Sequence, residues 1–173
     1  MTNEWVIPEI AANHDEMTAW RRDIHAHPEL GFEEVRTSEL VAEKLESWGL
    51  DVHKGLGKTG VVGTLRVGND TRSIGLRADM DALPIHETNT HNYISKNTGI
   101  MHACGHDVHM SIVAAVALYL KESDSFDGRV RFIFQPAEEQ APGGALSMIE
   151  GGCLEGVSNI IGCHVYPKIN AGR

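Results

Sequence analysis

The sequence predicts an α/β fold in which helices flank a mixed sheet. Two observations support this fold class. Helical and strand-like patterns alternate through the second half of the chain, and short runs rich in β-branched residues are bounded by Gly, Asn, Asp and Pro. The length of 173 residues and the hydrophobic content of 42% suffice for the core of one ordinary domain. No internal repeat or linker divides the sequence.

Two helices are predicted in the N-terminal part, because apolar residues recur there at helical spacing. These residues are Ile10, Met17, Trp20 and Ile24 in the first stretch, and Val41, Leu45 and Trp48 in the second. The first helix should run over residues 10–27, since Pro28 disfavours a helical conformation of the residue before it. The second should begin at Glu33 and end at Gly49, which supplies a C-terminal stop.

Residues 60–67 and 73–78 are short runs of β-forming residues. Between them lies the segment 68–70, Gly-Asn-Asp, whose residue types favour a tight turn. The two runs are therefore predicted to form a hairpin. The polar segment that follows, rich in His, Asn and Thr up to Asn97, is predicted to be a long surface loop.

Residues 108–121 are apolar nearly all round a helix, so we expect a buried helix there. Asp107 is placed to cap it, because its carboxylate can accept from the free amides of the first turn. The remaining predicted elements are a strand over 129–135, a short helix over 143–149 and a last strand over 159–165.

Composition opposes several classes of partner. A formal charge of −9 disfavours nucleic acid and anionic membranes. The most apolar run, residues 112–120, is too short to span a bilayer. The N-terminus lacks the basic start and apolar run of a secretory signal, so we expect a cytoplasmic location in which the three cysteines stay reduced.

Residues with metal-binding or acid–base chemistry lie where predicted strands end or the buried helix begins, as functional groups do in α/β folds. They are Asp79 and Asp81 after one strand, Cys104 and His106 before the helix, Glu138 and Glu139 after another strand, and His164 at the end of the last strand. Thiol, imidazole and carboxylate donors together suit a divalent transition metal, and the thiol argues against magnesium or calcium. Adjacent residues of an extended chain point to opposite sides, so one glutamate would bind the metal. Desolvation and a neighbouring like charge would suit the other to be a general base.

These motifs also have structural interpretations. Cys104 and His106, separated by one glycine, are compatible with a buried thiol and a capped histidine. Glu138 and Glu139 are compatible with a solvated surface pair. His25, at a helix end, suits a role in stabilising the helix dipole as well as one in lining a site.

The other histidines and cysteines have weaker signals. His109 falls one turn inside the buried helix and is expected to be packed or to support a ligand. Cys153 and Cys163 are expected to fill packed positions. Four histidines without an identifiable partner are expected to face solvent: His14, His53, His86 and His91.

Five segments occur in the order seen in the amidohydrolase branch of the M20 metallopeptidase family, which the chain resembles from its first helix to its end. They are HAHPELGFEE (25–34), LRADMDALP (76–84), MHACGHDVH (101–109), FQPAEE (134–139) and GCHVYP (162–167). That branch includes hippurate hydrolases, N-acyl-amino-acid amidohydrolases, N-acetyldiaminopimelate deacetylases and plant auxin-conjugate hydrolases. The resemblance implies a zinc-aminopeptidase-like catalytic domain that hydrolyses the amide bond of N-acyl amino acids.

The resemblance also implies roles for single residues. The implied metal ligands are Cys104, His106, Glu139 and His164. Glu138 resembles the base that deprotonates a metal-bound water, and Asp81 resembles the carboxylate that orients a ligand histidine and fixes its tautomer. Asp79 stands where other branches carry a metal-binding histidine. The family usually holds two divalent ions, manganese or zinc most often, and its full-length members are often homo-oligomeric.

In one respect the sequence departs from the family it resembles. Members are usually more than twice this length, with a lid and dimerisation domain and a returning part of the catalytic domain that carries a last metal-binding histidine. Residues 1–173 would then be the N-terminal part of the catalytic domain. We expect such a chain to expose an apolar face and an open sheet edge, to bind metal weakly and to turn over substrate poorly. The alternative is a non-catalytic remnant or interaction module that keeps the fold.

Overall fold

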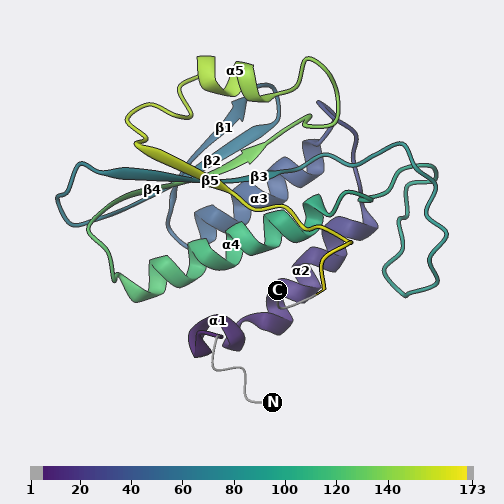
Figure 1. The fold of residues 1–173 in the computed structure, drawn as a ribbon, viewed down its shortest axis with the longest axis horizontal. Helices are drawn as coiled ribbons and strands as arrows, with labels where there is room; N and C mark the ends of the chain where they lie inside the picture. The colour runs from purple at the N-terminus through teal and green to yellow at the C-terminus, as the bar shows by residue number, and fades with distance from the viewer. Residues whose placement is uncertain (1–5, 171–173) are drawn as a thin grey trace.

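The computed structural model describes residues 6–170 and contains a five-stranded sheet covered by helices (Figure 1). The helices are α1 (Pro8–Ala12), α2 (His14–Ala26), α3 (Val35–Ser47), α4 (His106–Ser123) and α5 (Ala145–Glu150), and the strands are β1 (Asp51–Leu56), β2 (Gly60–Val67), β3 (Ser73–Asp79), β4 (Gly128–Gln135) and β5 (Asn159–Gly162). Helices α2, α3 and α4 lie on one face of the sheet and α5 lies on the other. The predicted mixed α/β fold is confirmed.

The strand order is β1-β2-β4-β3-β5. Strand β2 is antiparallel to both β1 and β4, whereas β3 is parallel to both β4 and β5. The three parallel strands therefore end at the same edge of the sheet. The segments that follow them begin there, which brings distant parts of the sequence together.

The predicted hairpin of residues 60–67 and 73–78 is wrong, because β4 lies between these two strands. Residues 68–70 are of the predicted turn type, but the connection they form crosses the start of β4 and does not link two adjacent strands. The carboxylate of Asp127, just before β4, accepts hydrogen bonds from the backbone amides of Asn69 and Asp70, at 2.9 and 2.8 Å. Local turn chemistry does not show that a strand from later in the sequence occupies the space between.

Strand β1 was not predicted, because its sequence lacks the alternation of apolar and polar residues that marks a half-buried strand. It is an edge strand, and only Leu56 in it is buried. The predicted first helix is divided at Asn13 into α1 and α2, and α2 ends at Ala26, one residue before the predicted end. The second predicted helix corresponds to α3, shorter by about two residues at each end.

Helix α4 begins two residues earlier than predicted, and Asp107 does not cap it. Its N-cap is Gly105 in a left-handed conformation with φ +87°, and no side chain caps the helix. A Cβ at Gly105 would lie 2.5 Å from Cγ2 of Val165, so both the conformation and the space require glycine. This turn allows the segment after β5 to cross the start of α4.

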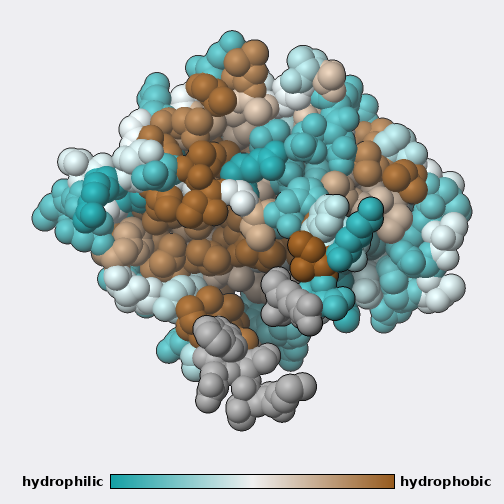
Figure 2. All heavy atoms as spheres, viewed as in Figure 1, coloured by the Kyte–Doolittle hydropathy of each residue, from teal (hydrophilic) through white to brown (hydrophobic). Residues whose placement is uncertain are grey.

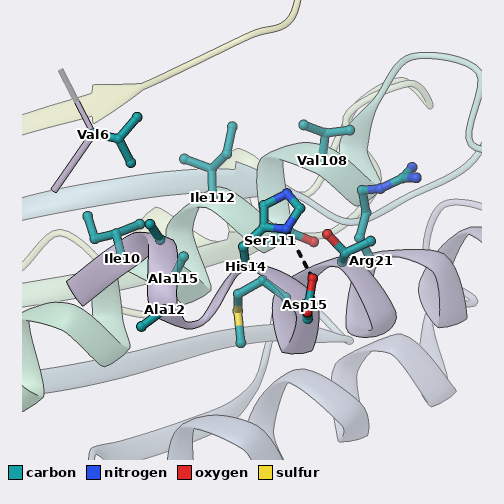
Figure 3. A pocket seen from close by; sticks show the side chains of 13 residues that line it. Val6, Ile10, Ala12, His14, Asp15, Arg21, Val108, Ser111, Ile112 and Ala115 are labelled. Atoms are coloured by element: carbon teal, nitrogen blue, oxygen red, sulfur yellow. Dashed lines mark hydrogen bonds and ion pairs between the residues drawn. The ribbon is translucent and has the colours of Figure 1, made fainter. Parts of the chain in front are cut away.

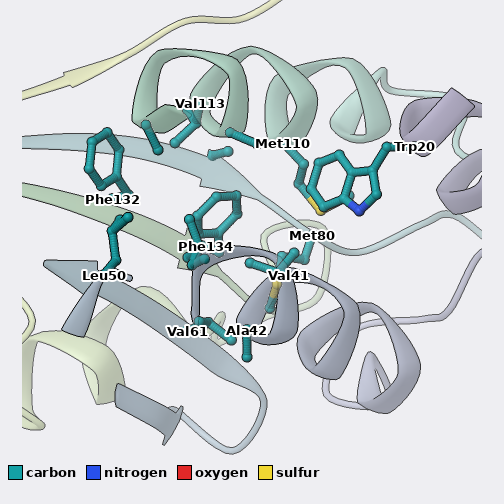
Figure 4. Packing of buried hydrophobic residues seen from close by; sticks show 14 of the residues in the cluster. Trp20, Val41, Ala42, Leu50, Val61, Met80, Met110, Val113, Phe132 and Phe134 are labelled. Carbon is teal, nitrogen blue, oxygen red and sulfur yellow. The ribbon is translucent and has the colours of Figure 1, made fainter. Parts of the chain in front are cut away.

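The main core fills the space between the sheet and helices α2, α3 and α4 (Figure 4). Alternate residues of β4 point into it, including Phe132 and Phe134, which are fully buried. Ile133, between them, points to the other face and packs with Met148 and Cys153 in a smaller cluster under α5. Successive side chains of β4 point to opposite faces of the sheet, so this strand contributes to both hydrophobic clusters.

An apolar face remains exposed over β5 and α4, as the sequence led us to expect (Figure 2). All four residues of the edge strand β5 are exposed, with Ile160 at 51% and Ile161 at 54%. Ile112 of α4, predicted to be buried, is 41% exposed and lines an open groove of about 580 Å³ against α1 and α2 (Figure 3). Among residues 6–170, no helix is both long and apolar enough to cross a membrane.

Candidate metal centre

The predicted site residues converge at the edge where the parallel strands end. Asp79 is the last residue of β3, Glu138 and Glu139 follow β4, and His164 follows β5. Cys104 and His106 stand at the start of α4, across this edge. Sγ of Cys104 lies 3.4 Å from Nε2 of His164, although 60 residues separate them in sequence. The structure thus brings the thiol and both imidazoles to one place.

His106 is fully buried and stands at the centre of the cluster. Its Nδ1 is 2.7 Å from the backbone carbonyl of Asp81, so Nδ1 carries the proton and Nε2 holds a lone pair. Within the described part of the chain, Nε2 has no hydrogen-bond partner. The nearest carboxylate oxygens lie 3.6 Å away on Asp79 and 3.9 Å away on both Glu138 and Glu139. A buried lone pair facing carboxylates is the arrangement that a bound cation would satisfy.

Three groups of donors meet at His106, each with donor atoms within 4.8 Å of one another. One is Cys104, His106 and His164, another is His106, Glu138 and Glu139, and the third joins His106 to Asp79 and His109. The four ligands inferred from the sequence are thus divided between two groups that share one imidazole. Their sulfur, nitrogen and oxygen donors fit a divalent transition metal.

Asp79 is held beside this centre by two hydrogen bonds. Its Oδ1 accepts from Nδ1 of His109 at 2.7 Å and its Oδ2 from Arg77 at 2.8 Å. Burial opposes the charged form, but the hydrogen bond from His109 and the positive charge of Arg77 prevail and lower the pKa of Asp79 to about 2. Asp79 therefore presents a full negative charge to His106 at neutral pH.

His109 supports the centre and does not line it as a donor. The amide of Val165 donates to its Nε2 at 3.0 Å, so Nδ1–H must be the group that donates to Asp79. Both ring nitrogens are occupied, as expected for a supporting residue. This bond also fixes the backbone next to His164.

Asp81 orients His106, but through a different atom from the one expected. The backbone carbonyl of Asp81 takes the close hydrogen bond from His106, and the carboxylate Oδ1 lies farther away, at 3.3 Å. Its Oδ2 accepts the amide of Glu139 at 2.9 Å. Burial opposes ionisation, yet these donors hold the pKa of Asp81 below its ordinary value. The side chain thus anchors the loop that carries the two glutamates.

Glu138 and Glu139 differ from the sequence prediction in two ways. Both carboxylates lie 3.9 Å from Nε2 of His106, whereas adjacent residues were expected to point to opposite sides. The backbone is not extended here, because Ala137 has a positive φ of 48°. The side chains are 40% and 27% exposed, so neither is desolvated as predicted for a general base.

Glu34 fixes the backbone just before these glutamates. It is fully buried, its Oε1 accepts the amide of Ala137 at 2.8 Å, and its Oε2 accepts the hydroxyl of Thr59 at 2.6 Å. Sequence reasoning noted the segment 25–34 but assigned Glu34 no role. A glutamate after a Gly-Phe turn gives no local sign that it reaches a loop 103 residues away.

The three cysteines lie in different surroundings. Cys104 is partly buried, and burial together with its contact with Glu139 raises the pKa of its thiol to about 12. A coordinated cation reverses this preference, because a thiol that binds a metal loses its proton. Cys153 is buried in the cluster under α5, as predicted. Cys163 is exposed, so its predicted packed position is wrong, because the sheet edge beside it is open.

A network around His25 was missed by the sequence interpretation. His25 is buried between the carboxylates of Asp107 and Glu87, at 2.9 and 3.2 Å. His91, expected to face solvent, is half-buried against Glu87. The only sequence signal was the motif that contains His25. Glu87 and His91 lie in a polar loop, and Asp107 had been assigned another role, as the cap of α4.

The chain is similar to known proteins in both sequence and fold. The chain is 42% identical over its whole length to an N-acyl-L-amino acid amidohydrolase of Geobacillus stearothermophilus and covers 47% of that protein. It is 48% identical over 94% of its length to a hippurate hydrolase of Campylobacter jejuni and covers 42% of it. A crystal structure from Bacillus subtilis, described as a dinuclear metal-binding peptidase of the M20 family, matches 92% of the chain with a TM-score of 0.87 and 42% identity; the chain covers 45% of it.

The chain spans less than half the length of these relatives. Its residues 75–173, more than half of the sequence, match the family described as Peptidase family M20/M25/M40. From this match and the shared fold, the chain belongs to that peptidase family.

Proposed function

We propose that the chain forms part of the catalytic domain of a metal-dependent amidohydrolase that cleaves the amide bond of N-acyl amino acids. The observation that carries this proposal is the buried, unpartnered Nε2 of His106, within the residues described, surrounded by Cys104, His164 and the glutamate pair. The named activities of the two curated relatives, on N-acyl-amino acids and hippurate, support the substrate class.

The proposed metal ligands are Cys104, His106, Glu139 and His164, for two divalent ions of the manganese or zinc kind. The dinuclear metal-binding peptidase of Bacillus subtilis supports a two-ion arrangement, and the sulfur, nitrogen and oxygen donors gathered around His106 could supply ligands for it. When bound, such ions polarise a substrate carbonyl and lower the pKa of water. The remaining chemistry falls to the residues of the chain.

Glu138 is the proposed general base. Its loop is pinned on both sides, by Glu34 at the amide of Ala137 and by Asp81 at the amide of Glu139. Its carboxylate therefore stays within reach of the centre while 40% of the side chain remains open to water and substrate. It would take a proton from water as the oxygen attacks the amide carbon, and would then give that proton to the leaving amine. No covalent intermediate with the protein is required.

The turnover of the 173-residue chain alone is proposed to be low. His164 and Glu138 are exposed, so the centre formed by the described residues is open to water. Water in an open site screens the charges that act on the substrate. An open site therefore stabilises the transition state less than a closed one does. A cytoplasmic location and homo-oligomeric full-length forms remain part of the proposal.

Metal content and hydrolysis, measured together, test the proposal. Purified wild-type protein and Glu138→Ala should contain equal amounts of manganese or zinc, whereas Cys104→Ala and His106→Ala should lose metal. Hydrolysis of hippurate and N-acetyl amino acids, followed by release of the free amine, should fall by about 10²-fold or more in Glu138→Ala. Glu150→Gln, an exposed glutamate at the end of α5, serves as the matched control.

Two outcomes would oppose the assignment. Unchanged metal content after the Cys104 and His106 substitutions would place the metal elsewhere. Metal binding without any hydrolysis above the level of Glu138→Ala would favour the alternative, a non-catalytic remnant or interaction module with the same fold.

A further inference from the structure

A second group of metal-type donors lies at the end of α2, outside the centre described above. It consists of His25, Glu87 and His91, whose donor atoms lie within 4.8 Å of one another. Nε2 of His25 and Nε2 of His91 each lie 3.2 Å from the same oxygen, Oε1 of Glu87. In a tetrahedral zinc site with bonds of about 2.0–2.1 Å, neighbouring donors are about 3.3 Å apart. The two distances to Oε1 of Glu87 match that spacing, and the two imidazole nitrogens lie within 4.8 Å of each other.

The surroundings of His25 orient it as a ligand. Oδ2 of Asp107 lies 2.9 Å from Nδ1 of His25 and is itself held by Arg21 at 2.8 Å. With its proton on Nδ1, the imidazole directs the lone pair of Nε2 at the Glu87 oxygen. Two lone pairs in contact require a positive species between them, which either a metal ion or a second proton on the imidazole supplies. A carboxylate behind a histidine is the usual support of a metal-binding imidazole.

Glu87 is also fixed before any ion arrives. Its Oε2 accepts the amide of Ser95 at 2.6 Å and its Oε1 accepts the side-chain amide of Asn89 at 2.9 Å. Only 3% of its side chain is exposed, so its charge is nearly removed from water. These two hydrogen bonds hold the carboxylate in place beside His25 and His91.

His91 completes the group from the solvent side. Its ring stacks on Tyr93, with centroids 3.8 Å apart and an angle of 18° between the planes. The side chain is 29% exposed, which leaves room for a water molecule as a fourth ligand. Its Nδ1 is buried and, in the part of the chain that the structure describes, has no hydrogen-bond partner.

From this geometry we propose that His25, Glu87 and His91 bind one divalent transition-metal ion of the zinc type, distinct from the ions of the Cys104–His106 centre. Two imidazoles and one carboxylate are a donor set that zinc takes, with water in the remaining position. The ion would tie the long loop between β3 and α4 to the end of α2. This inference does not depend on the proposed hydrolase activity.

The test uses Zn²⁺ and a background in which the first centre is disabled. The double variant Cys104→Ala/His106→Ala, freed of metal, should still bind one equivalent of Zn²⁺ in calorimetric titration. Adding His91→Phe, which keeps a ring to stack on Tyr93, should weaken that binding at least 100-fold. Adding Glu87→Gln should weaken it at least 10-fold. His86→Phe, an exposed histidine of the same loop, should leave it unchanged.

Two results would overturn the inference. One is the absence of saturable Zn²⁺ binding in the double variant, which would assign the positive species to a proton on His25. The other is Zn²⁺ binding that survives His91→Phe and Glu87→Gln. If the double variant fails to fold, the same comparison is made in the otherwise unchanged protein, where His91→Phe should remove one equivalent of zinc and His86→Phe none.

Discussion

Replacing Glu34 tests whether one buried carboxylate holds the loop before Glu138. Glu34→Ala leaves the amide of Ala137 and the hydroxyl of Thr59 buried without their acceptor. Each such group costs about 1–3 kcal/mol, so the two together cost about 2–6 kcal/mol. The removed carboxylate itself resists burial, which offsets part of this loss. We expect the free energy of unfolding to fall by about 2–4 kcal/mol.

Glu34→Gln is the matched variant for this prediction. The glutamine oxygen can still accept the amide of Ala137, and its NH₂ group can donate to the hydroxyl oxygen of Thr59. We expect the free energy of unfolding to change by less than about 1 kcal/mol. Glu33→Ala, at the exposed neighbouring position, controls for loss of a surface charge.

Urea denaturation followed by tryptophan fluorescence measures these differences, because Trp20 is buried in the main core. The slope against urea should stay constant while the midpoint shifts. Amide exchange over residues 136–140 should quicken in Glu34→Ala. If Glu34→Ala unfolds at the wild-type midpoint, the two hydrogen bonds do not stabilise the fold and the reasoning fails.

The stability difference between Glu34→Gln and wild type should depend on pH, with a sign that follows from the pKa of Glu34. Burial raises the pKa of Glu34 above its ordinary value of 4.5, although hydrogen bonds from Thr59 and backbone amides oppose the shift. A group with a raised pKa in the folded state contributes stability below its ordinary value, and that contribution is lost as the pH rises through the raised value. The stability of Glu34→Gln relative to wild type should therefore increase between pH 4 and pH 8. A constant difference across this range would contradict the assignment.

Three further predictions follow from single contacts. Asp79, with a pKa lowered from 3.8 to about 2, should contribute about 2 kcal/mol of stability that is present above pH 3.8 and is lost as the pH falls toward 2. Acid titration of the metal-free protein should show this contribution in wild type and in the exposed control Asp15→Asn but not in Asp79→Asn. Gly105→Ala should destabilise the chain more than Gly99→Ala, since both have positive φ but only the first meets Val165, at 2.5 Å; equal losses in thermal unfolding would refute the contact. In the native protein a thiol reagent should label Cys163 at once and Cys153 only on unfolding, and mass mapping that finds Cys153 labelled first would contradict their placement.

The sequence by itself indicated the buried face of α2 and the residues whose side chains are able to bind a metal. Apolar residues at helical spacing, such as Met17, Trp20 and Ile24, mark the buried face, because this periodicity is a local property of the chain. The gathering of Cys104, His106 and His164 was foreseen because functional groups of α/β folds collect where strands end and loops begin.

Only the tertiary structure decided how these pieces pair. Strand β4 enters between β2 and β3, and the carbonyl of Asp81, not its carboxylate, takes the close hydrogen bond from His106. Glu34 and His25 find partners 103 and 82 residues away. Such contacts depend on which distant segments the whole core brings together, and no local pattern of residues records that choice.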